Sequence, residues 1–247
     1  MKNNNKTILI TGGSRGIGQS IALKFAKNNY NVAITYSKNK KEANKTLSIL
    51  NKYNIESMAI KCDFLNKGAT KEMYNEFRSK FSKLNVLINN AGWTKYIEHS
   101  NLDDLSSDLF NQIIKINLKT VYLNIKHGIE LMEGKDNCII NISSIAGYNG
   151  VGSNIAYCAA KAGVNSLTKS FSQSLGPNIR VNGIAPGLTE TEMTSSGPSK
   201  YYDNQKKITP LGRIAKPNDI ADAAYAIVND MKFINGKTII IDGGRLI

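Results

Sequence analysis

Tyr157 and Lys161 stand four positions apart in the segment Ile155–Lys161. A tyrosine and a lysine at this spacing also occur by chance, as a core aromatic residue beside a solvated charge. On a helix, however, residues i and i+4 share a face, so the Lys161 ammonium would lie near the Tyr157 phenol. A nearby positive charge favours the phenolate and lowers the pKa of the tyrosine. The pair therefore predicts a tyrosine that exchanges a proton with a substrate near neutral pH.

A glycine-rich segment, Thr11–Gly18, follows the apolar run Thr7–Ile10 and precedes the amphipathic stretch Ile17–Asn28. Its Gly-x-x-x-Gly-x-Gly spacing differs from the G-x-G-x-x-G pattern, and a simple glycine turn is the alternative. The order strand, turn, helix favours a site for the pyrophosphate of a dinucleotide, held at the helix N-terminus. We expect cofactor contacts from Gly12, Ser14, Arg15, Gly16, Ile17 and Gly18.

Two further apolar runs end in small or polar residues. Asn89–Gly92 follows Val86–Ile88, and Ser143 and Ser144 follow Cys138–Ile142. Open α/β sheets bind their ligands at the carboxyl ends of their strands. These segments therefore indicate a ligand site at that edge of the predicted sheet.

Together, these segments, the Tyr157/Lys161 pair and Pro186-Gly187 resemble the short-chain dehydrogenase/reductase family, in the same order and over nearly all of the 247 residues. The motif set is most similar to that of 3-oxoacyl-(acyl-carrier-protein) reductases. The resemblance implies an α/β fold, with a single Rossmann-like, doubly wound parallel sheet and helices on both faces. It also implies an NADP(H)- or NAD(H)-dependent oxidoreductase.

The resemblance assigns catalytic roles to four residues. Tyr157 would give its proton to the substrate oxygen, and Ser144 would hydrogen-bond the same oxygen. Lys161 would lower the pKa of Tyr157 and bind the nicotinamide ribose. Asn117, in Ile116-Asn117-Leu118, matches an asparagine that helps to carry a proton to solvent.

Length and composition agree with one domain, residues 1–247, because no linker or composition break divides the chain and 41% of the residues are hydrophobic. Segments typical of strands and of helices alternate, which favours a parallel sheet covered on both faces. The expected strands are Thr7–Ile10, Asn31–Thr35, Ser57–Lys61, Val86–Asn89, Asn137–Ile142, Ile179–Ala185 and Lys237–Ile241.

The choice of cofactor depends on the end of the second expected strand. An Asp or Glu there would bind the ribose 2′-hydroxyl of NAD, but Tyr36 occupies this place. Arg15, Ser37 and Lys38 offer cations and a hydroxyl to a 2′-phosphate, so we expect NADP(H). The alternative for Lys38 is a solvated loop charge.

The resemblance implies further cofactor contacts. Asp63 would bind the adenine amino group, Asn90 the adenosine ribose, and Thr191, in preference to Thr189, the nicotinamide carboxamide. The remaining expected contacts are Ala91, Gly92, Pro186 and Gly187.

The substrate is less clearly indicated than the cofactor. We expect reduction of a 3-oxoacyl thioester on an acyl carrier protein, with a sugar, polyol or other small carbonyl as the alternative and a non-enzymatic nucleotide-binding scaffold as a third possibility. The segment at about 188–210 is rich in Ser, Gly, Lys and Tyr, and is interpreted as a mobile substrate lid or a disordered loop. Trp93 either lines the pocket mouth or packs in the core.

The net charge of +13 raises nucleic acid, anionic membranes and acidic proteins as partners. Because the lysines are scattered and asparagine is equally abundant, we expect no nucleic-acid or membrane partner. The polar N-terminus and the absence of a long apolar run predict a cytoplasmic protein. Three cysteines without metal-ligand spacing predict buried free thiols, and no metal site is expected. The resemblance implies a homotetramer, with interfaces at Leu105–Leu131 with Ile155–Leu175 and at the C-terminal strand with Gly243–Ile247.

Overall fold

The computed structural model describes residues 5–192 and 199–246. In these residues seven strands form one parallel sheet in the order β3-β2-β1-β4-β5-β6-β7. The reversal of strand order between β1 and β4 is the doubly wound arrangement that the sequence predicted. The strand bounds are β1 (Thr7–Ile10), β2 (Asn31–Tyr36), β3 (Ser57–Lys61), β4 (Val86–Asn89), β5 (Asn137–Ile142), β6 (Ile179–Pro186) and β7 (Thr238–Ile241).

All seven predicted strands are confirmed, and three of them have ends that differ by one residue. β2 continues to Tyr36, which pairs with Lys61, and β6 continues to Pro186, which pairs with Ile241. β7 begins one residue later than predicted. The Lys237 backbone N–H donates instead to the Asn182 side chain at 3.2 Å.

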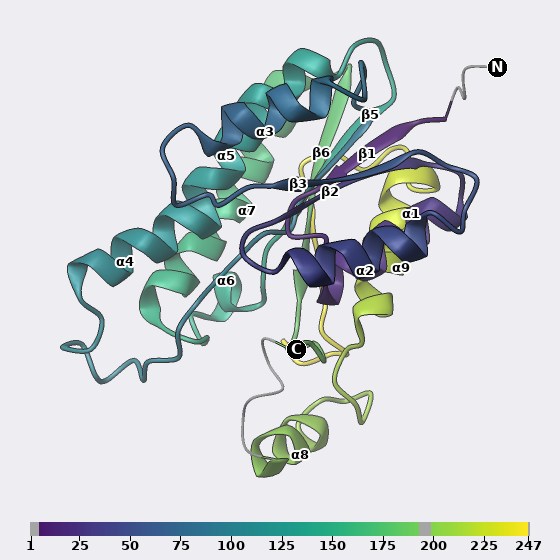
Figure 1. Cartoon of the computed structure of the whole chain (residues 1–247). Coiled ribbons are helices and arrows are strands. Elements are labelled where there is room, and N and C mark those ends of the chain that lie inside the picture. Colours follow the sequence, from purple (N-terminus) through teal and green to yellow (C-terminus); the bar gives the residue numbers. More distant parts are fainter. Residues whose placement is uncertain (1–4, 193–198, 247) are drawn as a thin grey trace.

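The helices cover both faces of the sheet (Figure 1). Successive strand residues point to opposite faces, so Ile8 and Ile10 pack against α1, α2 and α9, whereas Leu9 packs toward α3, α5 and α7. The two faces therefore bury two separate apolar clusters. The helix bounds are α1 (Gly16–Lys27), α2 (Lys40–Leu50), α3 (Ala69–Arg78), α4 (Ser107–Ile114), α5 (Thr120–Gly128), α6 (Ala146–Asn149), α7 (Ile155–Leu175), α8 (Ser199–Lys207) and α9 (Pro217–Asn229). A π-helical turn, η1 (Lys115–Lys119), joins α4 to α5, and a 3₁₀ turn, η2 (Ile129–Leu131), follows α5.

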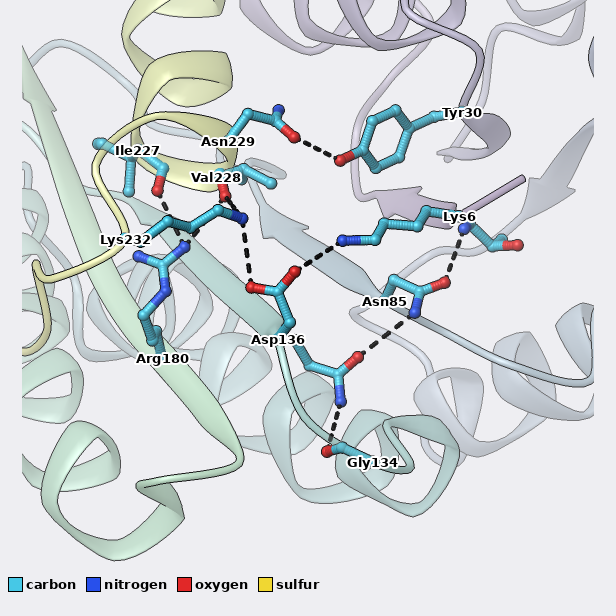
Figure 2. Close-up of polar contacts among 12 residues, drawn as sticks. Lys6, Tyr30, Asn85, Gly134, Asp136, Arg180, Ile227, Val228, Asn229 and Lys232 are labelled. Carbon is cyan, nitrogen blue, oxygen red and sulfur yellow. Dashed lines mark hydrogen bonds and ion pairs between the residues drawn. The ribbon is translucent and has the colours of Figure 1, made fainter. Parts of the chain in front are cut away.

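A polar cluster ties the elements together at the N-terminal ends of the strands (Figure 2). Asp136 accepts from Lys6 at 2.8 Å and from Lys232 at 3.2 Å, and these ammonium groups lower the pKa of the carboxyl group, Lys6 more than Lys232. Arg180 donates to the carbonyls of Ile227 and Val228, in the last turn of α9. These contacts join β1, β5, β6 and α9 at the end of the sheet opposite the predicted site.

The predicted lid falls partly outside the described residues, at 193–198. Its described part contains α8, which the sparse apolar pattern did not indicate, and Gln205 on this helix is 6% exposed. Thr209, which donates to the Gln205 carbonyl at 2.7 Å, is buried as well. The part of this segment that follows residue 198 therefore forms a helix and a turn.

The structure also bears on the cysteines, on membrane-spanning helices and on metal-ligand groups. All three cysteines lie in described parts of the chain and are buried free thiols, as predicted. Among the described helices, none has the length and apolar character needed to cross a lipid bilayer. Within residues 5–192 and 199–246 there is no group of three or more potential metal ligands.

Candidate active site

Helix α7 presents Tyr157 and Lys161 on one face, as their spacing predicted. The Lys161 ammonium lies 5.5 Å from the centre of the Tyr157 ring. It donates to the Ile142 carbonyl at 2.9 Å, and only 4% of the residue is exposed. Since Ile142 is the last residue of β5, this bond fixes the lysine at the carboxyl edge of the sheet.

Ser144 follows β5 and reaches the Tyr157 hydroxyl. Its Oγ accepts from the Ala146 backbone N–H at 3.2 Å, which holds the serine at the start of α6. Burial raises the pKa of Tyr157 to about 12, and the hydrogen bond with Ser144 acts in the opposite direction. Ser144 and Tyr157 therefore present two hydroxyl groups to the same space.

The predicted lowering of the Tyr157 pKa is wrong. Burial disfavours the charged form of both residues, and it also lowers the pKa of Lys161 to about 8. The ammonium is directed at the Ile142 carbonyl rather than at the phenol oxygen. At neutral pH the pair therefore consists of a neutral phenol and a protonated lysine.

Asn117 lies in the π-helical turn η1 and is fully buried. Its Nδ2 donates to the Trp93 carbonyl at 2.7 Å, and its Oδ1 accepts from the Trp93 backbone N–H at 3.3 Å. A Cβ atom placed on Gly92 would lie 2.8 Å from Asn117 Oδ1 and 3.9 Å from Lys161 Nζ. Asn117 and Lys161 thus flank the same glycine. Single π-turns inside helices occur frequently at functional sites.

The glycine-rich loop has the geometry that a dinucleotide phosphate requires. Gly12 and Gly16 have φ values of 65° and 54°, which strongly favour glycine. A Cβ on Gly18 would lie 2.3 Å from the Gly12 carbonyl oxygen, so only glycine allows α1 to pack this closely. α1 has no side-chain N-cap and no acidic residue in its first turn, which leaves its N–H groups to attract an anion. The loop therefore fits the cofactor phosphates.

Neighbouring elements hold this loop in place. The Thr46 hydroxyl of α2 donates to the Ser14 carbonyl at 2.9 Å, and Ile17 packs against the core. Asn90 donates to the carbonyls of Thr11 and Gly12 at 2.9 and 3.1 Å. The backbone N–H groups of Asn90 and Ala91 both donate to the Thr11 hydroxyl at 3.0 Å. Thr11 is a site residue that the sequence interpretation did not assign a role, although it begins the motif.

The residues expected to surround the adenosine lie at the carboxyl ends of β2 and β3. Tyr36 is half-buried at the end of β2, and the Ser37 and Lys38 side chains are exposed. Asp63 is half-buried after β3, and its Oδ1 accepts from the Leu65 backbone N–H at 3.1 Å. The structure thus brings all four predicted residues to one side of the glycine loop.

Arg15 has a partner that sequence reasoning missed. Its guanidinium forms a 2.9 Å ion pair with Glu192, and both side chains are more than half exposed. The two residues lie 177 positions apart in the chain, so no local pattern indicated the pair. The segment after β6 therefore reaches across to the glycine-rich loop.

The segment after β6 also brings Thr191 to the glycine-rich loop. The Thr191 methyl group would lie 3.3 Å from a Cβ on Gly16, so Thr191 faces the start of α1. Thr189 is 4% exposed and donates back to the Gly187 carbonyl at 3.1 Å. Gly187, the residue after Pro186, donates its backbone N–H to the Ile241 carbonyl of β7 at 2.9 Å. This arrangement favours Thr191 over Thr189 as the residue that faces the cofactor.

The rim of the site carries exposed apolar side chains. Trp93 is 40% exposed, which excludes the alternative that it packs in the core. Tyr96 and Val151 are also largely exposed, and a bond from the Ile97 N–H to the Ser153 carbonyl at 2.7 Å brings their segments together. These exposed side chains lie on segments that adjoin Gly92 and Tyr157.

Comparisons with known proteins show the family of the chain. The family model described as Enoyl-(Acyl carrier protein) reductase matches residues 12–245. A Staphylococcus epidermidis protein named 3-oxoacyl-(acyl-carrier-protein) reductase is 36% identical over 97% of this chain and 98% of its own. An Aquifex aeolicus protein of the same name is 29% identical and covers 99% and 98% of the two chains.

Among solved structures, a short-chain dehydrogenase from Burkholderia cenocepacia in complex with NADP superimposes with a TM-score of 0.92. It is 28% identical, and the alignment covers 100% of both chains. The sequence relatives and this structural neighbour align with nearly the whole length of the chain. The chain is therefore a member of the short-chain dehydrogenase/reductase family, and it is an oxidoreductase that uses a nicotinamide cofactor.

Proposed function

We propose that this protein reduces a carbonyl group to a hydroxyl group with NADPH, and that its substrate is a 3-oxoacyl thioester on an acyl carrier protein. The observation that carries the proposal is the convergence of Ser144, Tyr157 and buried Lys161 at the carboxyl edge of the sheet. The names of the S. epidermidis and A. aeolicus relatives support the choice of substrate. The exposed apolar side chains of Trp93, Tyr96 and Val151 at the rim support it as well.

Tyr157 is the general acid in this proposal. With a pKa of about 12 its phenol remains protonated at neutral pH, which is the form needed to donate a proton to the carbonyl oxygen. Ser144 donates a second hydrogen bond to the same oxygen and stabilises the charge that develops on it. NADPH, when bound, supplies the hydride.

Lys161 and Asn117 assist the proton transfer from Tyr157 in this proposal. Burial lowers the pKa of Lys161 to about 8, so most of the lysine is protonated at neutral pH and its ammonium can donate to the ribose hydroxyls. Asn117 lies beside it across Gly92, and its role in this proposal is to help carry a proton from solvent back to Tyr157. These two residues therefore position the cofactor and restore the acid.

The preference for NADPH rests on the end of β2. Tyr36 stands where a carboxylate would repel a 2′-phosphate, and Ser37 and Lys38 are exposed beside it. Arg15 lies in the adjoining loop, although it is paired with Glu192. The NADP complex of the B. cenocepacia relative supports the same choice.

Further proposals concern the whole molecule. We propose a single domain spanning 1–247, a cytoplasmic enzyme and a homotetramer. The tetramer would use the α5 and α7 surfaces and the β7 edge. Tyr122 on α5, Ile155 on α7 and Ile240 on β7 are each more than a third exposed, which supports both contact surfaces.

A substrate panel tests the proposed function. We expect NADPH oxidation with a 3-oxoacyl thioester, and a higher kcat/KM when the thioester is carried on an acyl carrier protein than on a small thiol. A higher kcat/KM for sugars or polyol-derived ketones would contradict the thioester assignment. NADPH binding without oxidation by any carbonyl would contradict catalysis altogether and support a scaffold.

A further inference from the structure

Asn154 is a buried asparagine directly in front of α7. It is 1% exposed, and its side chain makes three hydrogen bonds. Oδ1 accepts from the Tyr157 backbone N–H at 2.8 Å and so caps the helix. Nδ2 donates to the Thr94 hydroxyl at 2.9 Å and to the Lys95 carbonyl at 2.7 Å. One carboxamide therefore binds the backbone of the proposed acid and the segment that follows β4.

The segment that Asn154 holds also contacts Asn117. Trp93 exchanges two hydrogen bonds with the Asn117 side chain, at 2.7 and 3.3 Å. The Thr94 hydroxyl lies 2.6 Å from the Ser153 hydroxyl, which strengthens the same junction. A continuous set of bonds thus runs from Asn117 through residues 93–95 to Asn154 and the Tyr157 backbone. These bonds connect two elements of the site that are 40 positions apart.

We propose that Asn154 is a positioning residue, which sets the depth of the Tyr157 hydroxyl against Ser144 and couples it to Asn117. The inference rests on the proposed function, because it assumes that Tyr157 is the acid. Tyr157 lies in the first turn of α7, and the Asn154 side chain bonds this turn to the loop after β4. Misplacement of a reacting group by about 1 Å can lower a rate by about 10²-fold.

The bonds of Asn154 can be separated by substitution. Serine is as good an N-cap as asparagine, so Asn154→Ser keeps an acceptor for the Tyr157 N–H and removes both donated bonds. Ser106 caps α4 through a bond from the Leu109 N–H, and its side chain is exposed, so Ser106→Ala is the control for altering an N-cap away from the site. Asn154→Ser should lower kcat at least tenfold and leave the NADPH Kd within twofold. Ser106→Ala should change neither value.

Thr94→Val tests the route of the coupling. Valine keeps the shape of threonine but removes the hydroxyl that accepts from Asn154. In a double-variant cycle the effects on kcat should be less than additive, since both substitutions break the same bond. Fully additive effects, or an unchanged kcat in Asn154→Ser, would overturn the proposal.

A readout that needs no substrate keeps the positioning role separate from the proposed function. Amide hydrogen exchange in the peptide that covers Ile155–Lys161 should be at least tenfold faster in Asn154→Ser than in the wild type, and unchanged in Ser106→Ala. Unchanged exchange in Asn154→Ser would refute the positioning role even if the enzyme is active. If the wild type reduces no carbonyl, the proposed function fails, and the exchange rates still decide whether Asn154 holds the first turn of α7.

Discussion

Replacing Lys161 by methionine should make the protein more stable and inactive. Methionine has nearly the same length and fills the same buried space without a charge. Burial lowers the pKa of Lys161 from 10.5 to about 8. Among residues 5–192 and 199–246, no anion compensates the desolvation of this ammonium group.

The size of the effect follows from the pKa values. One pKa unit corresponds to about 1.4 kcal/mol, so the protonated Lys161 costs about 3 kcal/mol of folding free energy at neutral pH. Methionine also loses the hydrogen bond to the Ile142 carbonyl, which contributes about 1 kcal/mol. The net gain is about 2 kcal/mol, and Tm should rise by about 4–8 °C for a chain of this size.

The pH dependence of the free energy of unfolding distinguishes desolvation of Lys161 from better packing as the cause of the higher stability. Between pH 8 and 10.5 the unfolded chain binds a proton at Lys161 that the folded protein does not, so the wild type gains stability as pH rises. The penalty is fully present below pH 8 and is relieved by pH 10.5. The advantage of Lys161→Met should therefore be largest at pH 7 and shrink at pH 9.5.

Thermal unfolding at pH 7 and pH 9.5 measures both quantities, and Lys161→Arg, which keeps a charge, is the matched control. A methionine variant that is less stable than the wild type at pH 7 would refute the prediction. An advantage that is the same at both pH values would also refute it, because desolvation of a titrating ammonium would then not be the cause.

Three further predictions concern the cofactor and assembly. Lys38→Ala should reduce the ratio of kcat/KM for NADPH to that for NADH about tenfold, since a charge-assisted hydrogen bond contributes about 1.5–3 kcal/mol. Tyr36→Asp should favour NADH. An unchanged ratio in both variants would contradict the proposal that the end of β2 binds the 2′-phosphate. Glu192→Gln should lower the NADPH Kd up to about fivefold by releasing Arg15 from an exposed ion pair, whose contribution is about 0–1 kcal/mol, as measured by NADPH fluorescence; weaker NADPH binding would contradict it. Light scattering at micromolar concentration should give a tetramer, and Tyr122→Glu on α5 should dissociate it; a monomeric mass for the wild type would rule the tetramer out.

The elements of the sheet could be predicted from the sequence because their signals are local. Short apolar runs bounded by polar residues and glycines gave all seven strands, and the i, i+4 spacing placed Tyr157 beside Lys161. The order of strand, glycine-rich turn and helix at Thr7–Lys27 was also predicted. Each of these features depends on residues that are near neighbours in the chain.

The features that were missed depend on burial or on distant partners. The pKa of Tyr157 moves in the direction opposite to the prediction, because spacing alone does not show how much water a fold excludes. The pair of Arg15 with Glu192 and the contacts of Asn154 with Thr94 join segments far apart in the sequence. An N-cap asparagine could be recognised from the sequence, but the residues that accept hydrogen bonds from its side-chain NH₂ group could not.

The most direct test of the account is NADPH oxidation by Tyr157→Phe with the best 3-oxoacyl substrate, measured together with the NADPH Kd. Phenylalanine keeps the ring and removes only the hydroxyl that faces Ser144. General acid catalysis contributes about 10²- to 10⁴-fold, so kcat should fall by at least about 100-fold while Kd stays within about threefold. A variant that retains a near-normal kcat would contradict the assignment of Tyr157 as the acid.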